Sequence, residues 1–315
     1  MKLALIFPGQ GSQAVAMMQP FAGTQVVKDT FAEAADALDQ DLWKLVAEGP
    51  GDQLNATVNT QPVMLTAGIA VYRAWQAAGG AVPAMVAGHS LGEYSALVAS
   101  GVIAFKDAVP LVRFRAQAMQ EAVPIGTGAM AAILGLDDEA VRAACAESAD
   151  LQRGEIVEAV NFNAPNQVVI AGTKAAVERG AAACKAKGAK RALMLPVSAP
   201  FHSSLLKPAA ERLADYLKNI TFNTPTIPVV NNVDVAMVND PAAIKAALAR
   251  QACSPVRWVE VIKRMASAGV THIAECGPGK VLAGMTTRID KSLQGFAITD
   301  PASLADTLQT LEALK

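Results

Sequence analysis

The sequence predicts an α/β protein whose large domain, built on a parallel sheet, is interrupted by a smaller domain. Short apolar runs alternate with longer amphipathic stretches along most of the 315 residues, a pattern typical of α/β folds. One internal segment instead places two strand patterns next to each other. The 27 basic and 28 acidic residues nearly cancel, so the charge does not favour binding to nucleic acid or a membrane surface.

The strands expected in the large domain are short apolar runs at Leu3–Phe7, Ala84–Gly88, Ile227–Asn231 and His272–Glu275. Pro8 and Gly9 end the first run, which makes it too short for a secretory signal. No apolar run reaches the roughly 18 residues of a membrane span. Amphipathic patterns between the strands predict helices, for example over Val26–Ala47 and Pro62–Ala78.

The smaller domain follows a linker-like stretch, Pro124–Gly128. The patterns predict, in order, a strand, a helix, two strands, a helix and a strand, at Ala129–Leu136, Asp137–Ala149, Ile156–Asn161, Gln167–Ala171, Thr173–Lys187 and Arg191–Val197. This βαββαβ order is the ferredoxin-like unit. We therefore expect a large domain over residues 1–125 and 198–315 and a small domain over 126–197. A cleft between two such bodies is a usual place for a ligand.

The cysteines at positions 145, 184, 253 and 276 are widely spaced and form no C-x-x-C pair. Such a pattern predicts reduced thiols in a cytoplasmic protein rather than a disulfide framework.

A nucleophile-elbow pattern, G-x-S-x-G, spans Gly88 to Gly92 and places Ser90 between an apolar strand and a helical pattern. In such a turn the serine stands clear of the sheet, because glycines remove the side chains that would block it. The N–H groups at the start of the helix are available to an oxyanion. The resulting fold expectation is an α/β-hydrolase-like large domain. The alternative is a chance match in which Ser90 only caps the helix.

A serine nucleophile needs a base, and histidine is the usual one. The chain has three histidines. His89 is adjacent to Ser90 and should point elsewhere, while His272 sits in a predicted strand. His202 lies in the loop where the chain re-enters the large domain, and such loops often carry function. We therefore predict His202 as the base, with an ordinary pKa of roughly 6.5. No acid between Ser90 and His202 has a distinctive setting.

Arg115 falls in the middle of the apolar stripe when Val109–Val123 is projected as a helix at about 100° per residue. A buried guanidinium must meet a partner. A structural ion pair is one possibility. The other is a substrate carboxylate, which the guanidinium fork matches bidentately. Pro110 conflicts slightly with this helix, since proline is best tolerated in the first turn.

The loop Phe7–Gln13 contains Gly9, Gly11 and Ala14 at the spacing of the dinucleotide fingerprint G-x-G-x-x-A. That fingerprint should open a short βαβ unit, whereas the next segment has a long helical pattern. Nucleotide binding therefore stays a minor alternative. The other role is a glycine-opened turn that supplies a backbone N–H to the active site.

Several motifs occur together and in order: FPGQGSQ, GHSLGEYSAL, RFRAQAMQEA, VNFNAPNQVVIAG, PFHS and ECGPGK. Together they resemble the malonyl-CoA:acyl carrier protein transacylases of bacterial fatty acid synthesis. Acyltransferase domains of polyketide synthases are similar. The resemblance covers essentially the whole chain.

The resemblance implies a role for each matching position. Ser90 would be acylated, His202 would be the base, and Arg115 would bind the malonyl carboxylate. The main-chain carbonyl of Gln251 would orient the histidine, and Gln10 and Leu91 would supply oxyanion N–H groups.

The implied reaction moves malonyl from malonyl-CoA to the phosphopantetheine thiol of acyl carrier protein. Both thioesters are substrates, and no metal or redox cofactor is implied. The alternatives are a serine thioester hydrolase, a polyketide-pathway acyltransferase, a non-catalytic module that binds a carrier protein, and a nucleotide-binding oxidoreductase.

Overall fold

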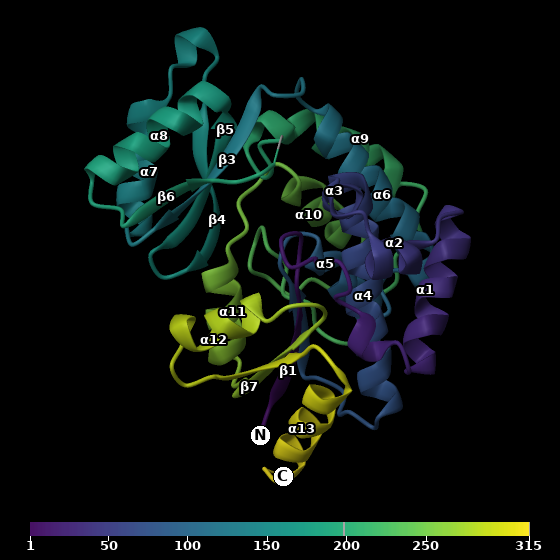
Figure 1. Ribbon diagram of the computed structural model, residues 1–315. Helices are drawn as coiled ribbons and strands as arrows, with labels where there is room; N and C mark the ends of the chain where they lie inside the picture. The colour runs from purple at the N-terminus through teal and green to yellow at the C-terminus, as the bar shows by residue number, and fades with distance from the viewer. Residues whose placement is uncertain (198, 315) are drawn as a thin grey trace.

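The computed structural model describes residues 1–197 and 199–314, which form two β-sheets flanked by helices (Figure 1). The larger body is built on a parallel sheet with strand order β2-β1-β7-β8. Its strands are β1 (Leu3–Phe7), β2 (Met85–Gly88), β7 (His272–Cys276) and β8 (Gln294–Ile298). The mixed α/β class and the parallel sheet predicted from the sequence are confirmed.

The central strand β1 is buried along its whole length, as a continuous apolar run in a parallel sheet predicts. Its side chains alternate between two hydrophobic clusters. Leu5 and Phe7 face the helices that begin after β1, whereas Ala4 and Ile6 pack with residues of α11 (Trp258–Ser267) and α12 (Val281–Ile289). The sheet is therefore covered on both faces.

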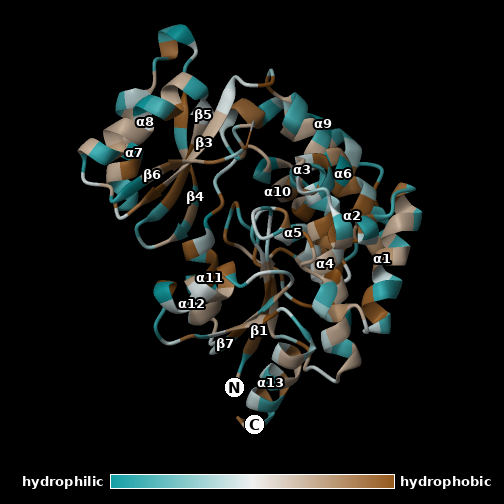
Figure 2. Cartoon of the chain, viewed as in Figure 1, coloured by the Kyte–Doolittle hydropathy of each residue, from teal (hydrophilic) through white to brown (hydrophobic). Residues whose placement is uncertain are grey.

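The other helices of the larger body surround this sheet. They are α1 (Gln25–Leu38), α2 (Leu42–Glu48), α3 (Gly51–Asn55), α4 (Thr57–Ala77), α5 (Gly92–Ala99), α6 (Phe105–Glu121), α9 (Lys207–Leu217), α10 (Pro241–Gln251) and α13 (Pro301–Glu312). Outer helices such as α1 alternate between hydrophilic and hydrophobic turns (Figure 2). Among the described residues, no helix is both long enough and apolar enough to cross a membrane.

The smaller body is an antiparallel sheet with strand order β4-β5-β3-β6. In chain order its elements are β3 (Gly128–Leu134), α7 (Asp138–Ser148), β4 (Val157–Ala164), β5 (Gln167–Thr173), α8 (Lys174–Ala186) and β6 (Arg191–Met194). This is the succession that the sequence predicts. Helices α7 and α8 lie together on the outer face of the sheet (Figure 1).

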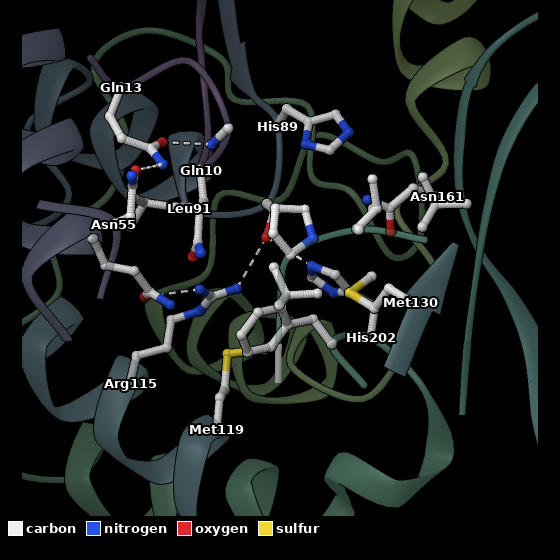
Figure 3. Close-up of a pocket in the computed structure, with 18 residues that line it drawn as sticks. Gln10, Gln13, Asn55, His89, Leu91, Arg115, Met119, Met130, Asn161 and His202 are labelled. Atoms are coloured by element: carbon white, nitrogen blue, oxygen red, sulfur yellow. Dashed lines mark hydrogen bonds between the residues drawn. The ribbon is translucent and has the colours of Figure 1, made fainter. Parts of the chain in front are cut away.

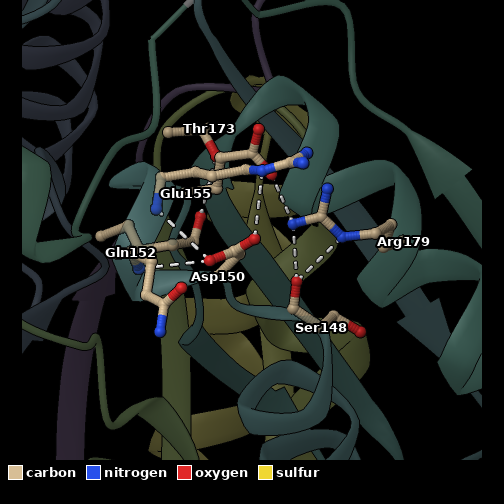
Figure 4. Close-up of polar contacts among 8 residues, drawn as sticks. Ser148, Asp150, Gln152, Glu155, Thr173 and Arg179 are labelled. Carbon is tan, nitrogen blue, oxygen red and sulfur yellow. Dashed lines mark hydrogen bonds and ion pairs between the residues drawn. The ribbon is translucent and has the colours of Figure 1, made fainter.

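A polar cluster ties the connection between α7 and β4 to α8 (Figure 4). The Arg179 guanidinium donates twice to the carbonyl of Ser148, at 3.0 and 2.9 Å, and forms an ion pair with Glu155 at 2.7 Å. The backbones of Asp150 and Glu155 hydrogen-bond to each other. The far end of the smaller sheet is thus held by side chains as well as by its ladder.

Strand β4 joins the two bodies at its free edge. The N–H of Phe162 donates to the carbonyl of Val256 at 3.0 Å, and the N–H of Val256 donates to the carbonyl of Val160 at 2.8 Å. Glu158, also on β4, accepts hydrogen bonds from the backbone and hydroxyl of Ser204. These contacts hold the smaller sheet across the carboxyl ends of β1 and β2.

Two predicted elements of the larger body are wrong in detail. The expected helix Val26–Ala47 is two helices, because Asp39, the residue after α1, is left-handed (φ 51°) and Asp41 caps the start of α2. The expected strand Ile227–Asn231 forms only isolated bridges to Val86 and Met237.

The predicted starts of two helices are also wrong, because each prediction placed a proline in the first turn. Helices α4 and α6 begin at Thr57 and Phe105, so Pro62 and Pro110 lie inside them rather than in the first turn. Strand β8 was not predicted, because its outer residues are exposed and its apolar pattern is weak. The predicted re-entry point into the large domain, Ser198, lies outside the described residues.

Gly92 at the start of α5 is expected to tolerate no side chain. A Cβ there would lie 2.1 Å from the carbonyl oxygen of Phe7, so Gly92→Ala should lower the free energy of unfolding by about 1–3 kcal/mol. The matched control is Gly284→Ala in α12, where a Cβ meets nothing within 4 Å and should stabilise the helix by about 0.5–1 kcal/mol. Denaturant unfolding of both variants measures this; equal stabilities would show that the contact with β1 is not tight.

Candidate active site

Ser90 occupies the sharp turn between β2 and α5, as the elbow pattern predicts. Its backbone is left-handed, with φ 51°, a conformation that non-glycine residues rarely adopt. Gly88 and Gly92 flank the turn, and a Cβ on Gly88 would lie 1.8 Å from the backbone of Gly92. The turn can close this tightly only because both positions are glycine.

His202 reaches Ser90 from the loop that follows the smaller sheet. Its Nε2 lies 2.7 Å from the Oγ of Ser90, and its Nδ1 lies 2.9 Å from the main-chain oxygen of Gln251 at the end of α10. A carbonyl oxygen can only accept, so Nδ1 carries the proton and Nε2 accepts from the serine hydroxyl. His202 is also left-handed, with φ 65°. The histidine is therefore oriented by a main-chain carbonyl, and no acid fills that position.

The other two histidines do not contact the hydroxyl of Ser90, although His89 lines the same cavity. His89 turns away from Ser90, and its Nε2 lies 2.7 Å from the Oδ1 of Asn163 on β4. His272 is buried on β7, where it stacks on Phe296. Of the three histidines, only His202 is within hydrogen-bonding reach of the serine hydroxyl.

Arg115 projects from α6 toward Ser90 and is only 2% exposed (Figure 3). It donates to the Oε1 atoms of Gln61 and Gln251 at 2.9 Å each, and to the Oγ of Ser90 at 3.1 Å. Its guanidinium also lies over the ring of Tyr94, 5.3 Å from the centroid. Each of these partners is neutral, so the structural ion pair left open by the sequence is not formed with any described residue.

Burial and the neighbouring cation set the protonation state of His202. Desolvation, the largest cause, and the positive charge of Arg115 together lower the pKa of His202 to about 3, against the opposing effect of the Gln251 hydrogen bond. The expected pKa of roughly 6.5 is therefore wrong for the folded protein. The imidazole is neutral at physiological pH and is ready to accept a proton.

These side chains open into a cavity of about 340 Å³. Ser90, His202 and Arg115 line it together with Met119 of α6 and Met130 of the smaller sheet, and Met130 lies beside His202 in Figure 3. The cavity lies between the two bodies, as expected, and has apolar walls around a small polar centre.

Gln10 and Leu91 both line this cavity. Within the described chain, neither N–H donates to a protein acceptor, whereas the N–H of Ser90 donates to the Oδ1 of Asn232 at 2.8 Å. Gln10 and Leu91 therefore carry the donors that are free to bind an oxyanion.

The glycines after β1 do not open a helix. A Cβ on Gly9 would lie 2.5 Å from the carbonyl oxygen of His89, so this glycine lets the loop approach the elbow. The first α-helix begins only at Gln25. The loop is thus a turn beside the active site. Its glycine spacing matches the dinucleotide fingerprint, but the βαβ unit that this fingerprint opens is not formed. The described residues contain no cluster of metal-ligating side chains.

Comparison with known proteins agrees with this geometry. A model of the acyl transferase domain matches residues 4–303. The malonyl CoA-acyl carrier protein transacylase of Escherichia coli K12 is 57% identical over 98% of this chain and 99% of its own length. The chain belongs to the malonyl CoA-acyl carrier protein transacylase family.

Solved structures of this transacylase family superpose closely. The acyl-carrier-protein S-malonyltransferase of Burkholderia pseudomallei is 65% identical, with a TM-score of 0.96 over 98% of this chain and 100% of that chain. A malonyl-transacylase in complex with a type II polyketide synthase acyl carrier protein is 52% identical, also with a TM-score of 0.96, over 98% and 100% of the two chains.

Sequence reasoning missed three polar residues of the transacylase site: Gln61, Glu93 and Asn232. Each is almost fully buried. Gln61 could have been noticed as a polar residue at the edge of the apolar run of α4. Nothing local marks Asn232 or Glu93, because their importance comes from contacts made across more than 130 residues.

The depressed pKa of His202 predicts an unusual pH profile. A serine-directed fluorophosphonate should label Ser90 at a constant rate from about pH 8 down to about pH 5, since the base stays neutral throughout this range. The measurement is the second-order labelling rate, with His272→Ala as the control because His272 is also buried but lies outside the site. A midpoint near pH 6.5 that persists both in the control and in Glu93→Gln, which lacks the carboxyl whose pKa burial raises to about 7, would contradict a desolvated His202.

Proposed function

We propose that this protein transfers malonyl from malonyl-CoA to the phosphopantetheine thiol of acyl carrier protein, in the service of fatty acid synthesis. The observation that carries the proposal is a buried Arg115 guanidinium whose hydrogen-bond partners are neutral, 3.1 Å from a serine paired with histidine. A desolvated cation of this kind favours a substrate that brings its own carboxylate.

The first half-reaction acylates Ser90. As the hydroxyl oxygen attacks the thioester carbonyl, its proton passes to Nε2 of His202. The oxyanion of the tetrahedral intermediate accepts hydrogen bonds from the N–H groups of Gln10 and Leu91. The C–S bond then breaks, and coenzyme A leaves with the proton from His202. The product is a malonyl ester on Ser90.

The second half-reaction reverses the roles. The pantetheine thiol of the carrier protein gives its proton to the neutral His202 and attacks the ester carbonyl, and Ser90 leaves as a hydroxyl. This is ping-pong transfer through a covalent intermediate. The steps use the chain's own groups and the two thioesters, so we propose that no metal or redox cofactor takes part.

Arg115 would exchange partners when substrate binds. In the described structure it donates to the Oγ of Ser90, but a malonyl carboxylate offers two oxygens in the geometry of the guanidinium fork. Transfer of this donor from the serine to the substrate would leave Oγ free to attack. Gln61 and Gln251 would continue to hold the guanidinium in place.

We also propose the finer fold assignment. The larger body is α/β-hydrolase-like over residues 1–125 and 198–315, supported by the elbow between β2 and α5. The smaller body, residues 126–197, is ferredoxin-like, supported by its strand order and antiparallel pairing. Four free cysteines, three of them buried, support a reducing compartment such as the cytoplasm.

Two other functions use the same residues. A serine thioester hydrolase would need only Ser90, His202 and an oxyanion site, with water as the acceptor. A polyketide-pathway transacylase is favoured by the relative that was solved with a polyketide carrier protein. Thioester turnover with and without a thiol acceptor separates hydrolysis from transfer, and comparison of carrier proteins from the two pathways separates the pathways.

Malonyl-CoA should add one malonyl group to the protein, and that group should lie on Ser90. Intact-mass and peptide mass spectrometry measure this, and addition of holo carrier protein should remove the label. Ser90→Ala should lose the adduct and lower the transfer rate by roughly 10⁴-fold. A malonyl group on another residue of the wild-type protein would refute the assignment.

Arg115→Ala should change the choice of substrate. Loss of the buried cation should raise the barrier for malonyl transfer by about 3–5 kcal/mol, whereas acetyl transfer should fall much less or rise. The measurement is kcat/KM for malonyl-CoA and acetyl-CoA.

The matched control for that comparison is Arg113→Ala on the same helix, because Arg113 is half-buried and hydrogen-bonds to Gln40 outside the cavity. An unchanged malonyl-to-acetyl ratio in Arg115→Ala would mean that selectivity arises elsewhere.

A further inference from the structure

We propose that Asn232 is a positioning residue for this reaction, because its side-chain carboxamide holds the left-handed backbone of Ser90 in the geometry that meets His202. The inference rests on the proposed function, in which Ser90 is the nucleophile. Asn232 does not line the cavity, and its side chain is fully buried. Its effect must therefore pass through the backbone of the elbow.

The carboxamide of Asn232 bridges the two sides of the turn. Its Oδ1 accepts from the N–H of Ser90 at 2.8 Å, and its Nδ2 donates to the carbonyl of Gly88 at 2.8 Å. When a backbone turns out of a strand, its next N–H and carbonyl groups lose their partners in the sheet. Here those groups are the N–H of Ser90 and the carbonyl of Gly88. A side-chain amide has the same donor and acceptor as a peptide group, so it can replace a neighbouring strand here.

The bridge stands where a parallel ladder stops. Upstream, the N–H of Val86 donates to the carbonyl of Pro228 at 2.8 Å, and the N–H of Val230 donates to the carbonyl of Val86 at 3.0 Å. In a regular parallel ladder, the next donor to Gly88 would be the backbone N–H of Asn232. That N–H instead donates to a side chain, and Nδ2 takes its place at Gly88. This substitution explains why the predicted strand Ile227–Asn231 forms only isolated bridges.

Glu93 on α5 holds Asn232 in this rotated position. Its Oε2 accepts from the backbone N–H of Asn232 and from Nε2 of Gln251, both at 2.9 Å. The same Nε2 of Gln251 donates to the carbonyl of Ser90 at 2.9 Å, and the Oε1 of Gln251 accepts from Arg115. The backbone N–H of Ser90 is therefore held by the amide of Asn232, and its carbonyl by the amide of Gln251. Both Asn232 and Gln251 donate in turn to the carboxylate of Glu93.

Positive φ at a residue with a Cβ is strained, and such strain persists only where the surroundings impose it. If the carboxamide is removed, the N–H of Ser90 and the carbonyl of Gly88 lose their partners. The backbone should then relax, and the Oγ of Ser90 should move away from Nε2 of His202. A displacement of about 1 Å at a reacting atom can cost on the order of 100-fold in rate.

The test compares Asn232→Ala and Asn232→Asp with Asn231→Ala. Asn231 is the control because it lies in the same segment, and its side chain accepts only from the backbone of Asp234. For each protein the measurements are kcat and KM for malonyl transfer, thermal stability, and the rate of Ser90 labelling by a fluorophosphonate. In that labelling the Oγ–P bond forms as fluoride leaves and the serine proton passes to His202.

We expect Asn232→Ala to lower kcat and the labelling rate together, on the order of 100-fold, with KM within about threefold of wild type. Asn231→Ala should keep both rates. Labelling needs no malonyl group. A wild-type protein that is labelled but transfers no malonyl would therefore refute the proposed substrate. The labelling rates of the variants would still test the positioning role of Asn232.

Asn232→Asp keeps an acceptor for Ser90 but presents a carboxylate to the carbonyl of Gly88. Protonation restores the donor, so its labelling rate relative to wild type should rise as the pH falls from 8 to 5. Glu93 accepts from the backbone of residue 232, and burial raises its pKa to about 7, with Arg115 lowering and Asp234 raising it; His202 faces the same turn through Ser90 and stays neutral over this range. An aspartate at position 232 would also shift the pKa of Glu93, so the ratio is measured a second time in a Glu93→Gln background, where only residue 232 of this pair titrates.

Two results would overturn the proposal. One is an Asn232→Ala protein whose kcat and labelling rate stay within about threefold of wild type. The other, decisive even if Asn232→Ala does not fold, is an Asn232→Asp protein that is folded at each pH by thermal melting but whose labelling rate relative to wild type does not change with pH.

Discussion

The left-handed backbone of Ser90 is the constraint on which the rest of the site depends. A residue with a Cβ adopts this conformation only when its neighbours leave no easier choice. Here the neighbours are two glycines, a buried asparagine amide and the end of β1. His202, the partner of Ser90, is left-handed as well. The pair therefore meets across two strained turns, each held from outside by other segments of the chain.

Electrostatics in the site follow from the same burial. Arg115 is a cation without a contacting carboxylate among the described residues, and burial together with the field of Arg115 keeps His202 neutral. Glu93 lies one hydrogen-bonded amide away, through Gln251. Burial raises the pKa of Glu93 to about 7, so at neutral pH it is only partly ionised and does not neutralise the cation. A substrate carboxylate that binds in the cavity would then neutralise the positive charge of Arg115.

Much of this could be predicted from the sequence, because the signals are local. The elbow, the βαββαβ succession and the place of Arg115 on an apolar stripe depend on residues close together in the chain. The resemblance to a known family supplied Gln251, which no local pattern marks. Asn232 and Glu93 were missed because their contacts exist only in the folded chain. The pKa of His202 was misjudged for a related reason: burial and a neighbouring cation cannot be seen in the loop sequence.

The attachment of β4 to Val256 has a consequence for how such sites diversify. The hydrogen bonds between β4 and Val256 are main-chain bonds, which do not depend on side-chain identity, and the Glu158 side chain adds to them from outside the cavity lining. Residues on its inner surface, such as Met130 and Val169, can therefore be exchanged without loosening the walls of the chamber. Changes in these lining side chains would alter the size of the acyl group that fits the cavity. The contact between Ser90 and His202 would stay the same, because the backbone that carries both residues does not move.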